Sequence, residues 1–116
     1  ELTRLLEEHI LGAADLLEAA KTGDPGPIQE ASTNWYANGD EIAAFLSAAN
    51  PDRWPRIDMQ AQMKMHLDVT LLEATARLNG DYASDIAAYD EVEAHIVEFA
   101  DLLSRGIIQQ FPERFA

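Results

Sequence analysis

Three histidines, His9, His66 and His95, are the side chains of this chain that are best suited to chemistry. An imidazole can bind a transition metal, form hydrogen bonds through either nitrogen, or change its charge near neutral pH. Each histidine lies in a segment whose apolar residues recur every three or four positions, a spacing typical of amphipathic helices. Whether the three rings act together therefore depends on the helices that carry them.

Clusters of glycine, proline, asparagine and aspartate divide the chain into four such segments. The breaks fall at residues 22–27, 50–55 and 79–81, and Gly106 ends the last segment. Glycine and asparagine are typical of helix ends, and Asp24, Asp52 and Asp81 are suitable N-caps. Four helices of roughly 20 residues, each ~30 Å long, predict an all-α fold, an antiparallel up-down-up-down four-helix bundle. We expect residues 1–116 to form this single domain, with the apolar segment 107–116 folded back onto the bundle end.

The histidines are predicted to lie at one height in this bundle. His9 is 14 residues before Gly23, and His66 is 13 residues before Asn79. The same count, continued through the turns, reaches His95 on the fourth helix and Glu41 on the second. The error of the count is about one helical turn, ~5 Å.

Three imidazoles and a carboxylate in an apolar core are costly unless a partner satisfies them. One transition metal ion, such as Fe, Zn, Mn or Cu, would do so and would leave a position for water, O₂ or a small substrate. We therefore expect a mononuclear site, with redox or O₂-related chemistry, sensing or storage as its role. The expected ligands are His9, Glu41, His66 and His95, and the residues expected to orient them are Asn38, Thr70, Tyr89 and Glu93.

A second interpretation needs no metal. The histidines would form a hydrogen-bonded polar layer that fixes the register of the bundle, as buried polar residues do in coiled coils. The protein would then be a non-enzymatic, acidic interaction module that binds a basic partner or a second copy of itself. Met65, Val69 and Leu72 form an apolar strip on the third helix, away from the main core face, and are its expected contact surface.

The composition argues against several classes of function. The chain has no cysteine, which excludes disulfides, thiolate metal sites and iron–sulfur clusters. Its 8 basic and 21 acidic residues give a net charge of −13, which disfavours nucleic acids and anionic membranes. No apolar run reaches the ~18–20 residues that a membrane span needs, and no signal-peptide pattern is present. We expect a cytoplasmic protein whose partner is a metal ion or small molecule, with homo-oligomerisation left open.

The segment from about Leu2 to Ser104 resembles the metal-binding four-helix bundles of the hemerythrin-like and ferritin-like groups in its architecture. Hemerythrin-like chains carry His-x-x-x-Glu and His-x-x-x-His pairs, whereas Thr70 follows His66 and Ala13 follows His9 at that spacing. Ferritin-like chains carry Glu-x-x-His. Here the residue three positions before each histidine is apolar, namely Leu6, Met63 and Val92. The resemblance implies a metal held between helices, and the departures favour one ion over a di-iron pair. Residues 35–43 and 106–112 also resemble a small, uncharacterised bacterial family, which implies no particular activity.

Overall fold

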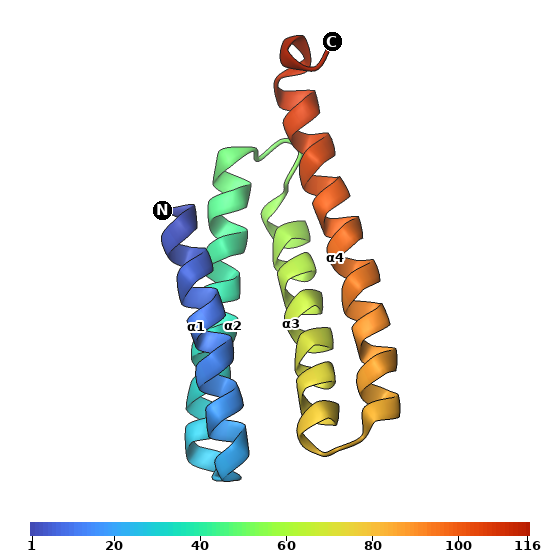
Figure 1. Cartoon of the computed structure of the whole chain (residues 1–116). Coiled ribbons are helices and arrows are strands. Elements are labelled where there is room, and N and C mark those ends of the chain that lie inside the picture. The colour runs from blue at the N-terminus through green and yellow to red at the C-terminus, as the bar shows by residue number, and fades with distance from the viewer.

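The computed structural model describes all 116 residues and contains four long helices. They are followed by one turn of 3₁₀ helix, η1. The elements are α1 (Leu2–Thr22), α2 (Pro25–Ala49), α3 (Arg56–Leu78), α4 (Tyr82–Gln110) and η1 (Pro112–Arg114). Successive helices run in opposite directions along one long axis (Figure 1). The predicted all-α, up-down-up-down four-helix bundle is therefore confirmed. None of these helices combines the length and the apolar character that crossing a membrane requires.

The turns after α1 and α3 have the predicted chemistry. Gly23 and Gly80 adopt positive φ values of 70° and 72°, a conformation that costs glycine little because it has no Cβ. The side chain of Asp24 accepts a hydrogen bond from the backbone of the first turn of α2, and Asp81 does the same for α4. These N-caps satisfy backbone donors that the helix itself leaves free. The second turn differs, because Pro55 rather than Asp52 precedes α3.

The end of α4 is not where the sequence predicts it. Gly106 lies inside the helix, and a Cβ added there would be 2.2 Å from the indole nitrogen of Trp54. Glycine therefore allows the connection between α2 and α3 to lie directly on α4, and Asn50 Nδ2 donates to the Gly106 carbonyl oxygen at 3.0 Å. Residues 107–110 continue the helix instead of folding back. The remaining residues extend past the other helices, where Phe111 and Phe115 are exposed (Figure 1).

The core has two parts along the bundle. One contains Leu16, Trp35 and Leu67. The larger part joins residues of all four helices and of the α2–α3 connection, namely Leu5, Ile42, Ala43, Trp54, Met59, Met63 and Phe99. Gly39 of α2 faces α3, and a Cβ there would be 2.7 Å from Leu67 Cδ1. The close contact between the two central helices thus depends on the missing side chain.

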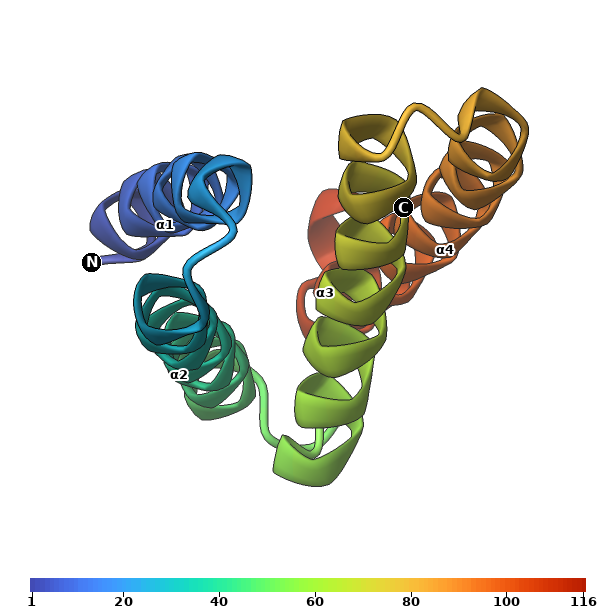
Figure 2. The same ribbon diagram turned by 90° about the horizontal axis from the view of Figure 1, so that it is seen from below.

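The bundle is open on one side. α1 packs against α2, α2 against α3, and α3 against α4, whereas α1 and α4 do not form the fourth interface of a closed bundle. Seen along the bundle, the α1–α2 and α3–α4 hairpins meet at the α2 and α3 edge and diverge on the opposite side (Figure 2). The region where α1 and α4 diverge is important for the candidate site.

Candidate functional site

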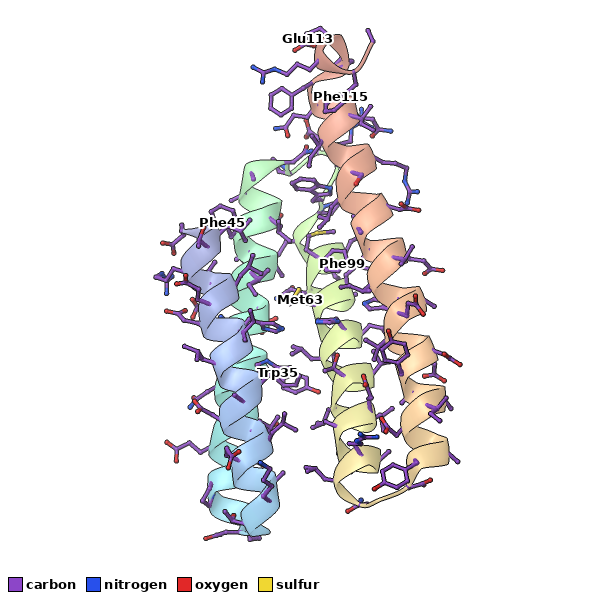
Figure 3. The ribbon with its side chains drawn as sticks, viewed as in Figure 1. Trp35, Phe45, Met63, Phe99, Glu113 and Phe115 are labelled. Carbon is purple, nitrogen blue, oxygen red and sulfur yellow. The ribbon has the colours of Figure 1, made fainter.

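The three histidines form a row across the middle of the bundle. The ring centroids of His9 and His66 are 5.9 Å apart, and those of His66 and His95 are 6.2 Å apart. Trp35 stacks on the outer side of His9 at 5.5 Å, and Phe99 lies beyond His95 at 6.2 Å. Figure 3 labels Trp35 on α2 and Phe99 on α4, the two aromatic residues next to His9 and His95. The three histidines therefore lie at one level of the bundle, as the residue count predicts, and they form a row.

The first ring has a defined tautomer because α2 holds it from the side. Asn38 Nδ2 donates to the Leu5 carbonyl oxygen at 3.0 Å, so Asn38 Oδ1 faces His9 Nδ1, 2.8 Å away. That oxygen can only accept, so Nδ1 of His9 carries the hydrogen and Nε2 keeps its lone pair. Trp35 Nε1 also donates to the His9 backbone oxygen at 3.1 Å, which ties α1 to α2 at this level.

The last ring is held in a similar way from α3. His95 Nε2 lies 3.1 Å from the backbone oxygen of Gln62 and must donate to it. The lone pair of His95 is therefore on Nδ1. Histidines that bind metals almost always donate their other N–H to a carbonyl or carboxylate oxygen, and His9 and His95 both have this arrangement.

The central ring, His66, has no such partner. Its Nδ1 is buried and forms no hydrogen bond. Burial, with a smaller contribution from the neighbouring His9 and His95, lowers the pKa of His66 below its ordinary value, which favours the neutral ring. An unsatisfied buried nitrogen costs about 1–3 kcal/mol, and a neutral imidazole is the form that binds a metal.

Two of the residues expected to orient the histidines lie near the row. Asn38 holds the His9 ring, as predicted. Thr70 Oγ1 instead donates to the backbone oxygen of His66 at 2.7 Å and leaves the ring free. The other two, Tyr89 and Glu93, are exposed and form no hydrogen bond with His95.

Glu41 is exposed, and no hydrogen bond or ion pair connects it to a histidine. It follows Asp40 and precedes the buried Ile42, so its side chain is rotated by about 100° from the inward direction of Ile42. Asn38, which the sequence assigns to a supporting role, is the α2 side chain that forms a hydrogen bond with a histidine ring of the row. No feature of the sequence predicts that the backbone oxygen of Gln62 accepts the hydrogen bond from His95.

The row opens into an apolar groove of about 260 Å³ on the open side of the bundle. His9 and His66 are its only polar lining residues. The others are Leu2, Leu6, Ile42, Leu46, Met63, Ile96, Phe99, Ala100 and Leu103. Met63, which Figure 3 labels, projects from α3 into the space between the two hairpins. A small molecule could therefore approach the imidazoles without displacing a helix.

The side chains as they stand form a row and not a three-ligand cage. No group of three or more histidine, aspartate or glutamate side chains is arranged to hold a metal ion. Adjacent pairs are different, because a metal bound at normal Zn–N distances holds two imidazole centroids about 5–6.5 Å apart. The observed 5.9 and 6.2 Å lie within that interval, and the interplanar angles of 30° and 20° mean that binding would require ring rotation to direct two in-plane lone pairs at one ion. His66 thus has a partner ring at a suitable distance on each side.

Comparison of the chain with protein-family models, curated proteins and solved structures finds no match in any of the three. The row of histidines and the groove above it are therefore the features from which a function is inferred.

Proposed function

We propose that this protein binds a single transition-metal ion through its row of histidines, at the floor of the apolar groove. The observation that carries the proposal is the buried, unpartnered Nδ1 of His66 between two further imidazoles. His9 and His95 each donate one N–H to a carbonyl oxygen and keep the lone pair on the other nitrogen. This combination supports a ligand role better than a self-sufficient polar layer, because a complete polar layer would leave no ring nitrogen unsatisfied.

His66 would be the central ligand, with His9 or His95 as the second. The third ring would join by rotation about its side-chain torsions, at the cost of its present hydrogen bond. Neutral imidazoles suit Zn, Cu and Fe, whereas Mn prefers oxygen ligands, so the exposed Glu41 makes Mn the weakest of the four candidates. A bound Zn would act as a Lewis acid, and bound Fe or Cu would add redox chemistry. The apolar groove would admit a small neutral molecule such as O₂ to the open positions.

The proposal is tested by titrating the metal-free protein with Co²⁺, followed by visible absorption, and by competition with Zn²⁺. We expect one ion per chain with a dissociation constant of about 10 μM or tighter. A variant in which all three histidines are replaced by phenylalanine keeps the ring volumes and should lose this binding. The matched control, Glu41→Gln, removes an acidic group outside the row and should bind as the wild type does.

The same ions should also stabilise the fold, because a ligand that binds only the native state adds about 2.7 kcal/mol at one hundred times its dissociation constant. The absence of stoichiometric binding, or equal affinity in the wild type and the three-phenylalanine variant, would overturn the proposal. Circular dichroism of the variant establishes that a loss of binding is not a loss of helix.

A further inference from the structure

The two helices that flank the groove carry exposed apolar side chains. Leu6 of α1 and Ile96 of α4 line the groove itself, and Ile10, Leu17 and Tyr89 are exposed on the same two helices. Single exposed apolar residues are ordinary on a protein surface. These recur at helical spacing on two helices that face one groove, and that arrangement is typical of a contact surface for another helix.

α4 is the most acidic helix of the bundle, whereas α2, with three acidic and no basic residues, is slightly more acidic than α1. α1 carries four acidic and two basic residues, and α4 carries six acidic and one basic, which together give −7 of the total −13. α3, at the base of the groove, carries three of each and is neutral. No charged residue lines the groove itself. The acidic residues of α4 without an ion pair are Asp90, Glu91, Glu93, Glu98 and Asp101.

We infer that the groove between α1 and α4 docks an amphipathic helix of a partner protein, with its apolar face on the groove and basic residues along its flanks. An apolar helix face fits because the groove lacks the helix–helix contact that closes a bundle. Basic flanks fit because the α4 wall has a net charge of −5 with five unpaired carboxylates, and the whole chain has a net charge of −13. A second copy of this chain is a poorer occupant, since it would bring a further charge of −13 to the same surface.

This surface differs from the strip that the sequence suggests on the third helix. Val69 is buried, so Met65 and Leu72 are separated and do not form a continuous apolar surface. They nevertheless provide matched controls, because their exposed fractions of 50% and 60% are similar to the 45% and 40% of Leu6 and Ile96 in the groove.

The test uses a synthetic peptide of about 18 residues, which forms a helix ~27 Å long, with leucines on one face and lysines on the other. One control peptide has the same composition in an order that places leucines on all faces. A second control replaces every lysine with glutamate. By calorimetry with the full chain, we expect the amphipathic basic peptide to bind at least tenfold more tightly than either control, with an affinity that falls as salt rises.

Variants then locate the binding surface. The double substitution Leu6→Asn with Ile96→Asn should weaken peptide binding at least tenfold, and Met65→Asn with Leu72→Asn should leave it unchanged. The inference is overturned if the basic peptide does not bind, if the reordered peptide binds equally well, or if both double variants lose affinity alike. It is also overturned if sedimentation detects a dimer that the Leu6 and Ile96 substitutions abolish, because the occupant would then be a second copy. All three histidines remain in both variants, so a Co²⁺ titration of the same samples tests the metal proposal separately.

Discussion

Asn38 of α2 holds the His9 ring of α1 through a 2.8 Å hydrogen bond from Nδ1 to Oδ1, and it donates to the Leu5 carbonyl oxygen of the same helix. One amide therefore links the two helices at this level and fixes the position of the hydrogen on His9. It does so at the end of the row where Trp35 also stacks.

Asn38→Ala should destabilise the protein by about 1–3 kcal/mol, because it leaves a part-buried imidazole N–H and a carbonyl oxygen without their partner. Urea unfolding measures this change, and ¹⁵N spectra of the histidines should show that His9 changes from one tautomer to a mixture. Asn34→Ala is the control, since Asn34 lies on the same helix and is exposed. Equal stability of the two variants would contradict the bridging role of Asn38.

Removal of single histidines should affect metal binding unequally. The sequence places His9 at the centre of its apolar stripe and so makes it the principal expected ligand, whereas the structure places His66 between the other two rings. His66→Ala should therefore abolish Co²⁺ and Zn²⁺ binding, and His9→Ala and His95→Ala should each weaken it, because one adjacent pair survives in both. Unchanged metal content in His66→Ala would be incompatible with this order.

The Tyr36 hydroxyl should ionise at a higher pH than an ordinary tyrosine. Burial and a 2.7 Å hydrogen bond to Asp68 raise the pKa of its hydroxyl to about 12. The unfolded chain releases this proton near pH ~10, so the stability that the raised pKa contributes is present below that pH and is lost as the pH rises from about 10 to about 12. Ultraviolet absorption of tyrosinate should show one late step, which Tyr36→Phe removes. If the alkaline loss of stability is as steep in Tyr36→Phe as in the wild type, Tyr36 is not its source.

Gly106→Ala should destabilise the fold, because the new methyl group would lie 2.2 Å from Trp54 Nε1 and force the indole away from α4. Overpacking of this kind costs about 1–3 kcal/mol. For a domain of this size we expect the melting temperature to fall by at least about 4 °C. Gly26→Ala is the control, since the nearest atom to its added Cβ is 3.6 Å away. A melting temperature equal to that of the control would mean that the glycine is not needed for this contact.

The sequence by itself determined the features that arise from local chemistry and helix geometry. Gly23 and Gly80 end helices because they can adopt positive φ, and Asp24 and Asp81 begin them because their carboxylates accept hydrogen bonds from the first turn. The sequence also determined that the three histidines lie at the same height in the bundle. Antiparallel helices with short turns convert residue counts into heights, at a constant rise per residue.

Only the tertiary structure decided which sides of the helices meet. It kept α1 and α4 apart, placed Trp54 on Gly106 so that α4 continues through a predicted stop, and directed Asn38 rather than Glu41 toward the histidines. These outcomes depend on how side chains from distant parts of the sequence pack against one another. Helical periodicity shows which side of a helix is apolar, but it does not show which other helix will pack against that side. Rotation and spacing of whole helices are therefore properties of the assembled core.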